Sequence, residues 1–166
     1  GSTRDHTLEI KAILSNGQEV VFNSLTKEEF AEKCLQKDLE GSIYQNINEI
    51  LSDPGHQSEI IQQYPDPSIH RRNTGYALDL LLDSNPFIAG SQPFNFCKLI
   101  AGSEGTLCLI TEIKLNLVPL PPPEKALLCV HCSSLEDAFK GNLVALKHNP
   151  VAVELMDDII LQQTKS

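Results

Sequence analysis

The sequence has little positive charge and gathers none of it into a patch. Lysine and arginine together number 13 against 22 acidic residues, and the formal net charge is −9. The pair Arg71-Arg72 is the most basic stretch in the sequence. A protein that binds a phosphate backbone concentrates positive charge on one face, because counterion release supplies much of the affinity. The composition therefore argues against nucleic acid as a partner.

The sequence also lacks a long apolar run. No stretch approaches the roughly 18 residues that indicate a membrane-spanning helix, so no membrane span is expected. Hydrophobic residues make up 41% and charged residues 21%, which is ordinary for a globular protein. The 166 residues are enough for one domain with a short appendage, and a chain of this length can bury a real core.

The cysteines do not suggest a disulfide framework. There are five, an odd number, scattered among apolar neighbours. This favours free thiols in a reducing compartment, and a cytoplasmic location is expected. Cys129 and Cys132 have a spacing seen in zinc sites, but they lie in an expected strand that would point the two sulfurs to opposite faces. No second pair of ligands follows and the histidines are not metal-spaced, so no metal site is predicted.

Period-two alternation predicts an N-terminal β-hairpin. Residues 7–14 and 18–22 flank Asn16-Gly17, a strong turn signal because both central residues of a type I′ turn need positive φ. Thr26 and Glu29 form a capping box, which predicts a helix to about Lys37. Further helices are expected at 42–52, 58–63 and 75–82, and the longest strand at 107–118.

Four prolines between Pro119 and Pro123 mark the clearest boundary, because proline cannot join a central strand. We expect one unit over 3–120 and a second over 124–166. The second should contain a strand at 126–132, a helix at 135–147, a short strand and a final helix. The predicted fold class is α+β, an antiparallel sheet built from the hairpin and the 107–118 strand, with flanking helices on one face.

Three segments, taken in order, carry a resemblance to one family. They are R-N-T-G-Y-A-L at 72–78, L-I-A-G-S-E-G-T-L at 99–107 with its continuation to Leu115, and V-E-L-M-D at 153–157. Together they resemble the FAD-linked oxidases of the vanillyl-alcohol oxidase superfamily, in the branch of glycolate oxidase and the D-lactate and D-2-hydroxyglutarate dehydrogenases. The sequence pattern R-R-x-x-G-Y-x-L-D is most similar to that of the large bacterial dehydrogenases that also carry a C-terminal iron–sulfur region.

The resemblance implies FAD as cofactor and a small 2-hydroxy acid as substrate of the full-length enzyme. Residues 3–120 would be the second subdomain of a PCMH-type FAD-binding domain, and 124–166 the beginning of an α+β cap domain. The pyrophosphate loop, the catalytic residues and any iron–sulfur cluster would lie outside the chain. We therefore expect a piece that is inactive by itself, binds FAD weakly or not at all, and allows homodimer contact through its truncated cap.

The same resemblance places the flavin nucleotide along the glycine segment. The expected cofactor-binding residues are Gly102, Ser103, Glu104, Gly105, Thr106, Leu107, Cys108, Leu109 and Ile110. Glycines 102 and 105 lack a Cβ, so the backbone there can turn sharply and approach a ligand. At position 108 this chain has cysteine where the family usually has glycine. The segment lacks the G-x-G spacing of a dinucleotide fingerprint and the Gly-Lys-Ser/Thr of a Walker loop.

Several alternatives remain open. Taken without its flanking segments, the glycine segment is more typical of an ordinary tight turn into a strand, and the three segments together reverse that preference. Arg71-Arg72 is either a solvated pair or an anion site, and Glu154 with Asp157 is a candidate capping pair. The chain is either part of a flavoenzyme or a stand-alone interaction module that kept the fold without its cofactor. The first reading predicts an open groove beside Gly105, lined by Leu107, Leu109 and the Tyr76 region.

Overall fold

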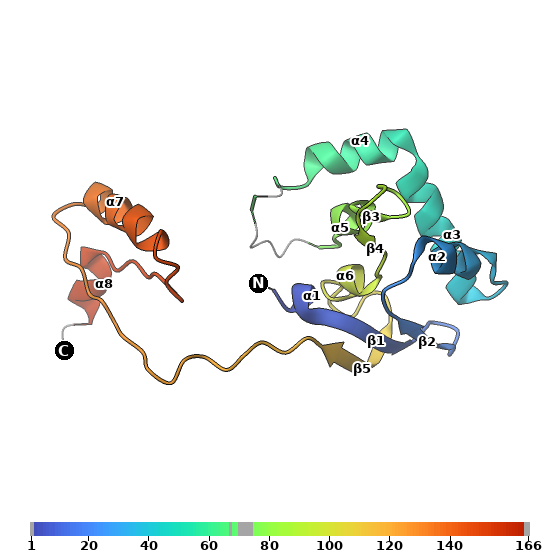
Figure 1. The fold of residues 1–166 in the computed structure, drawn as a ribbon, viewed down its shortest axis with the longest axis horizontal. Helices are drawn as coiled ribbons and strands as arrows, with labels where there is room; N and C mark the ends of the chain where they lie inside the picture. Colours follow the sequence, from blue (N-terminus) through green and yellow to red (C-terminus); the bar gives the residue numbers. More distant parts are fainter. Residues whose placement is uncertain (1, 67, 70–74, 165–166) are drawn as a thin grey trace. The chain divides into compact units, whose positions relative to one another are not determined.

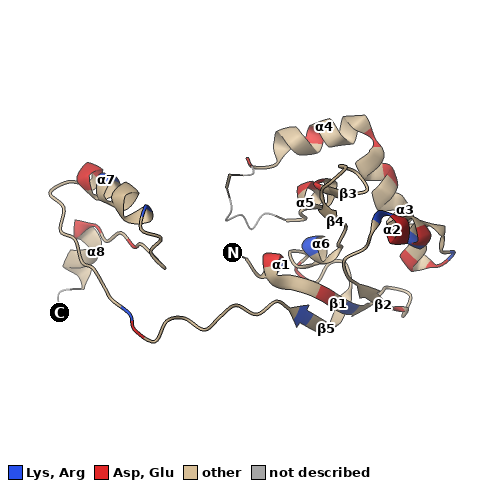
Figure 2. Ribbon diagram, viewed as in Figure 1, with Lys and Arg blue, Asp and Glu red and all other residues tan. Residues whose placement is uncertain are grey.

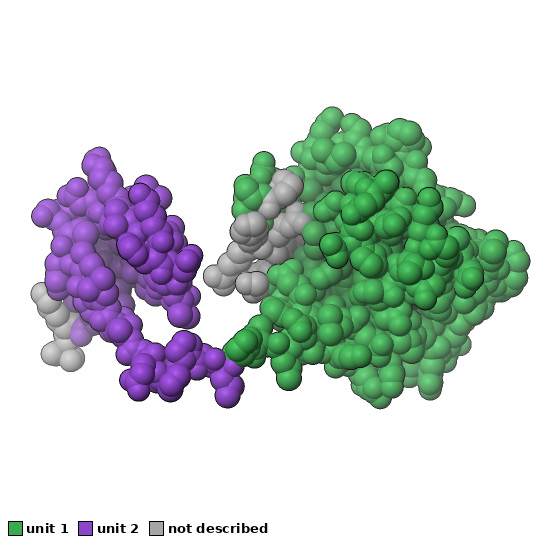
Figure 3. Space-filling model, viewed as in Figure 1, with its two compact units in different colours: residues 1–119 green, residues 120–166 purple. Residues whose placement is uncertain are grey.

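The computed structural model describes residues 2–66, 68–69 and 75–164 (Figure 1). The chain divides into two compact units, unit 1 over residues 1–119 and unit 2 over residues 120–166, and the division falls inside the proline-rich segment (Figure 3). Helices accompany a small antiparallel sheet, so the predicted α+β class is confirmed. No helix in the described ranges is long and apolar enough to cross a membrane.

The sheet of unit 1 has the predicted composition. Strands β1 (Thr7–Ile13), β2 (Glu19–Phe22) and β5 (Leu109–Leu115) run in the order β2-β1-β5, and both pairs are antiparallel. Its helices lie on one side of the sheet (Figure 1). On the other side Lys11 and Glu112 form an ion pair of 2.7 Å in solvent. Strands β1 and β2 therefore have one buried and one solvated face, as alternation in an antiparallel sheet requires, whereas every residue of the edge strand β5 is exposed.

The predicted turn type of the hairpin was wrong. Gly17 has φ +85°, whereas Asn16 does not have positive φ, so a type I′ turn is excluded. The Gly17 amide donates to the Leu14 carbonyl over 2.9 Å, and the Leu14 amide donates to the Gln18 carbonyl over 2.9 Å. This is the three-residue loop in which a glycine in the left-handed region forms a G1 bulge. The loop keeps Leu14 and Val20 on the buried face.

The first three large helices start at side-chain caps. In α2 (Lys27–Leu35) the Glu29 amide donates to Thr26 Oγ1 over 3.2 Å and the Thr26 amide to Glu29 Oε2 over 2.8 Å, which confirms the capping box. Helix α3 (Leu39–Ser52) begins earlier than predicted, because Asp38 caps it. Asp53 ends α3 and caps α4 (Pro54–Gln63), which has proline at its first position.

Shorter elements complete unit 1. Helix α5 (Leu78–Leu82) lies within a predicted helix, whereas α1 (Thr3–His6) and α6 (Cys97–Ile100) were not expected. Strands β3 (Ser84–Asn85) and β4 (Gln92–Pro93) make one short parallel pair in a segment predicted as loop. Strand β5 ends at Leu115, so the predicted strand at 107–118 is shorter at both ends.

The core of unit 1 lies between the sheet and the helices and is rich in aromatic side chains. Phe94 contacts both Phe30 and Phe96 edge-to-face, with ring centroids 4.6 and 4.9 Å apart. Tyr44 contacts Phe96 in the same way at 4.8 Å. Such pairs add about 0.5–1.5 kcal/mol each to the benefit of burying the rings. Leu51 and Leu81 are completely buried beside them. Ile100, which lies just before the glycine segment, belongs to this core, so the core anchors the start of that segment.

Unit 2 contains two helices and no described strand. Helix α7 (Leu135–Leu146) starts at Ser134, whose hydroxyl accepts from the Asp137 amide over 3.1 Å. Helix α8 (Asp158–Gln163) starts at Asp157, which accepts from the Ile160 amide over 2.9 Å, so Asp157 is a cap while Glu154 lies outside the helix. The strand predicted at 126–132 was wrong, because that segment has no neighbouring strand to pair with in the part of unit 2 that is described.

Candidate functional site

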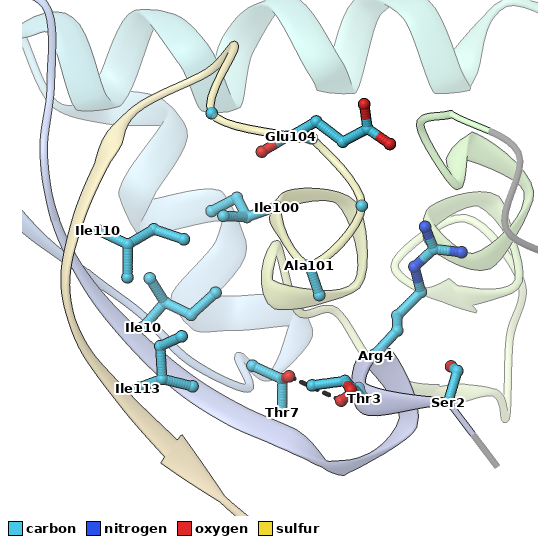
Figure 4. A pocket seen from close by; sticks show the side chains of 13 residues that line it. Ser2, Thr3, Arg4, Thr7, Ile10, Ile100, Ala101, Glu104, Ile110 and Ile113 are labelled. Atoms are coloured by element: carbon cyan, nitrogen blue, oxygen red, sulfur yellow. Dashed lines mark hydrogen bonds between the residues drawn. The ribbon is translucent and has the colours of Figure 1, made fainter.

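A groove of about 470 Å³ lies beside the glycine segment of unit 1 (Figure 4). Ile10, Ile110 and Ile113 of the sheet gather on one side of it, and Arg4 of α1 lies on the other. The complete lining is Ser2, Thr3, Arg4, Thr7, Ile10, Ile100, Ala101, Gly102, Ser103, Glu104, Gly105, Ile110 and Ile113. An apolar wall facing a polar one suits a ligand that has both an apolar and a polar part.

The wall of the groove contains a tight turn, Ser103 to Thr106. The Thr106 amide donates to the Ser103 carbonyl over 3.0 Å, and the two central residues, Glu104 and Gly105, have φ +50° and +77°. Positive φ at both central positions defines a type I′ turn. Glycine adopts this conformation freely, whereas a residue with a Cβ is disfavoured there by about 1–2 kcal/mol. Glu104 is thus held in a conformation that its own side chain disfavours.

A chain of hydroxyl groups stabilises the same turn. Thr106 Oγ1 donates to the Ser103 carbonyl over 2.6 Å. The Tyr76 hydroxyl lies 2.6 Å from Thr106 Oγ1, so the segment before α5 is joined to the turn. Ser103 itself is buried, while Glu104 and Gly105 are exposed along the groove. The turn therefore has one side packed into the protein and one side open.

Gly102 has a packing role rather than a conformational one. A Cβ at this position would overlap the Arg4 guanidinium and would lie 3.0 Å from the Gly75 carbonyl oxygen. Arg4 Nη2 donates to that same carbonyl over 3.2 Å. Because Gly102 has no side chain, the Arg4 guanidinium can lie against the glycine segment. Gly105, in contrast, has no atom within 4 Å of where a Cβ would be, so its side faces open space.

The structure brings together only part of the predicted site. Gly102, Ser103, Glu104, Gly105 and Ile110 line the groove. Thr106, Leu107, Cys108 and Leu109 do not, and the expectation that Leu107, Leu109 and Tyr76 would line it was wrong. Cys108 packs against the core, and burial raises the pKa of its thiol.

Sequence reasoning missed the second wall of the groove. This wall includes Arg4 of α1, with Thr3 and the N-cap Ser2. The rest of the unassigned lining, Thr7, Ile10, Ile100 and Ile113, also comes from segments to which no site was assigned. A helix of four residues is too short to show periodicity, so nothing in the sequence pointed to Arg4. The basic pair Arg71-Arg72 lies outside the described residues. Elsewhere in unit 1 several helices contain acidic residues, with lysine and arginine scattered among them (Figure 2).

In the described ranges, no group of three histidine, cysteine or acidic residues could hold a metal ion. Cys129 and Cys132 are free and exposed in unit 2.

The known proteins that are similar to this chain all have the same name. D-2-hydroxyglutarate dehydrogenase of Pseudomonas putida is 29% identical over 161 residues, and that of Haemophilus influenzae is 29% identical over 168 residues. The Escherichia coli protein of the same name is 26% identical over 162 residues. The chain resembles the D-2-hydroxyglutarate dehydrogenases. This confirms the resemblance that the three sequence segments predicted.

The similarity covers nearly all of this chain but only a small part of each relative. It covers 97% of this chain for the Pseudomonas protein and 99% for the Haemophilus protein, but the chain spans only about 15% of the length of these curated relatives. No family model matches the chain, and no solved structure gives a significant match. The similarity includes the glycine segment, β5 and both units, because it runs through nearly the whole chain.

Proposed function

We propose that unit 1 forms one wall of the FAD site of a 2-hydroxy-acid dehydrogenase. The observation that carries the proposal is the open groove beside the Ser103–Thr106 turn, in a chain similar throughout to D-2-hydroxyglutarate dehydrogenases. On this proposal unit 1 is the second subdomain of a PCMH-type FAD-binding domain and unit 2 is the beginning of the cap. The substrate of the whole enzyme is a 2-hydroxy acid of the D-2-hydroxyglutarate, D-lactate or glycolate type.

The groove has the chemistry that a flavin nucleotide needs. Isoleucine side chains from β1 and β5 offer apolar cover for a flat ring system. The amides of Glu104 and Gly105 donate to no acceptor within the described residues, so they are available to a ligand. When bound, FAD would accept a hydride from the carbon that carries the substrate hydroxyl. The role of this chain is to bind and orient the cofactor, and no residue of it is assigned to the chemical step.

One wall gives little affinity. A ligand in this groove keeps its other face in water, so little apolar area is buried against an association cost of at least about 4 kcal/mol. We therefore expect the chain alone to bind FAD weakly or not at all, and to be inactive. A preparation that stays yellow through purification would contradict this expectation.

The proposal is tested by titrating the ¹⁵N-labelled chain with FAD and following amide chemical shifts. Shifts should concentrate at Gly102–Gly105, Ile110 and Arg4. Gly105→Val should remove them, because its branched side chain would project into the open groove. Gly90→Val is the matched control, since Gly90 also has positive φ (+81°) and open space around its Cβ position but does not line the groove. Shifts that survive Gly105→Val, or that map elsewhere, would show that the cofactor site is misplaced.

A second function is favoured by a different observation. Unit 2 exposes many large apolar side chains, among them Leu128, Phe139 and Leu143, as expected of a module that associates with another protein. This reading predicts concentration-dependent association in sedimentation experiments and no response of the groove to FAD. The titration above separates the two readings, because only the flavoenzyme reading predicts shifts at the turn.

A further inference from the structure

The groove contains a buried positive charge with no anionic partner. Arg4 is only 8% exposed. Its Nη2 donates to the neutral Gly75 carbonyl, its Nε is buried and donates to nothing described, and no ion pair joins it to a carboxylate among the described residues. Its backbone carbonyl accepts from another cation, Lys98, whose Nζ donates to it over 3.2 Å. Burying a charge without a counter-charge is costly, so such a group normally has a partner.

The fold holds Arg4 in this place rather than letting it reach solvent. The Ser2 amide donates to Asp5 Oδ2 over 2.7 Å, which closes the first turn of α1 and occupies the nearest carboxylate in sequence. Gly102 leaves the space that the guanidinium fills. A surface arginine needs neither feature. The two together indicate that the charge is directed to the groove for use there.

Two residues that line the same groove have free backbone amides. The Glu104 and Gly105 amides have no acceptor among the described residues, and both residues line the groove with Arg4 (Figure 4). Adjacent free amides beside a guanidinium form a receptor for an oxyanion, because charge-assisted hydrogen bonds are the strongest available to such a ligand. The groove, at about 470 Å³, also has an apolar wall of isoleucines that an isolated anion would leave empty.

We propose that Arg4 and the Glu104 and Gly105 amides bind a phosphate oxyanion of a nucleotide whose ring system covers the isoleucine wall. The assignment of that nucleotide to the flavin cofactor rests on the proposed function, whereas the oxyanion site itself does not. Arg4 is then a binding residue that recognises the charged part of the ligand.

Glu104 opposes this binding. Its carboxylate is the single acidic group among the residues that line the groove, and it lies on the side of the groove where Arg4 lies (Figure 4). A negative charge there repels a phosphate and lowers its affinity. Removing it should therefore strengthen binding, an effect opposite in sign to the loss of Arg4.

The experiment is a titration of the whole ¹⁵N-labelled chain with inorganic pyrophosphate, followed at the Arg4 Nε–H signal and at the amides of Glu104 and Gly105. We expect all three to shift together. Arg4→Gln should weaken pyrophosphate binding about tenfold or more, as loss of a charged hydrogen bond implies. Lys98→Gln is the matched control, because it removes the same charge from a residue beside α1 that does not line the groove, and it should have a much smaller effect. Glu104→Gln should tighten binding.

Two further ligands separate the sources of the anion. Arg4→Gln should weaken the response to FAD but leave the response to riboflavin, which has no phosphate, unchanged. If Arg4→Gln does not fold, the wild-type titration and Glu104→Gln decide the matter alone. Pyrophosphate that leaves the three signals unmoved overturns the proposal, as does D-2-hydroxyglutarate shifting them when pyrophosphate does not. A response to pyrophosphate with none to FAD would keep the oxyanion site and reject the flavin function. A response to FAD that is unchanged by Arg4→Gln would keep the flavin function and reject the oxyanion site.

Discussion

The Tyr76 hydroxyl lies 2.6 Å from Thr106 Oγ1, and it is the donor of that hydrogen bond. The direction follows because Thr106 Oγ1 already uses its single proton to donate to the Ser103 carbonyl over 2.6 Å. Tyr64, the residue that ends α4, donates in turn to the Tyr76 carbonyl over 2.6 Å. A path of hydrogen bonds therefore runs from α4 to the turn that lines the groove, and it holds the turn against its backbone strain.

Replacing Tyr76 with phenylalanine should lower the free energy of unfolding by about 1 kcal/mol, the usual contribution of one hydrogen bond. Thr106→Val should cost somewhat more, because it removes two bonds. The double variant should cost less than the sum of the single ones, since both remove the same contact. Urea denaturation followed by circular dichroism measures all three. Strict additivity would mean that the Tyr76–Thr106 bond does not stabilise the turn.

Local signals predicted much of unit 1. The capping box at Thr26 and the alternation of the hairpin depend on residues close in sequence, and both were confirmed. The strand expected at 126–132 failed because a strand also needs a partner, which no local pattern supplies. The groove was placed beside Gly105, but its second wall was missed. Arg4 and Gly102 are remote in sequence, and only the fold shows that one makes room for the other.

The two central residues of the turn should respond differently to exchange between glycine and a larger residue. Gly105→Ala should destabilise unit 1 by about 1 kcal/mol, because a Cβ at φ +77° is disfavoured even where space is open. Glu104→Gly relieves the same strain at φ +50° and offsets it with greater unfolded-state entropy, so its net effect should be near zero. Urea denaturation of the two variants gives the comparison. Equal losses would indicate that the side chain of Glu104 contributes a stabilising contact.

The cysteines should react at very different rates with a thiol reagent at about pH 8. Burial raises the pKa of the Cys97 thiol to about 12, and its Sγ donates to the Phe22 carbonyl over 3.2 Å. A raised pKa keeps the thiol protonated, and reaction requires the thiolate, so Cys97 should react only on unfolding. Cys129 and Cys132 are exposed and should react first. Mass spectrometry after short labelling identifies the sites, and Cys129→Ser with Cys132→Ser should remove the fast phase. Early labelling of Cys97 would contradict the packing of α6.

Removal of unit 2 should leave the stability of unit 1 nearly unchanged. Every buried residue described belongs to unit 1, and the core cluster ends at Ile100 with Cys108 packed against it. Hydrophobic burial is the main favourable contribution to folding, so the described residues of unit 2, 120–164, none of which is buried, add little to it. A chain ending at Pro119 should therefore unfold within about 0.5 kcal/mol of the whole chain, the range of changes that touch no core contact.

A chain ending at Pro119 should also expose much less apolar surface than the whole chain. Leu127, Phe139 and Leu143 are each more than half exposed, so the whole chain should bind the dye ANS and the shortened one should bind far less. Phe94→Ala is the positive control for the stability assay, because loss of this completely buried ring should cost about 3–5 kcal/mol. If truncation lowered stability by a comparable amount, unit 2 would have to bury apolar surface in solution. The exposure of the unit 2 side chains in this structure would then be wrong. The proposal that unit 2 is the beginning of a cap whose apolar side chains lie exposed would be contradicted.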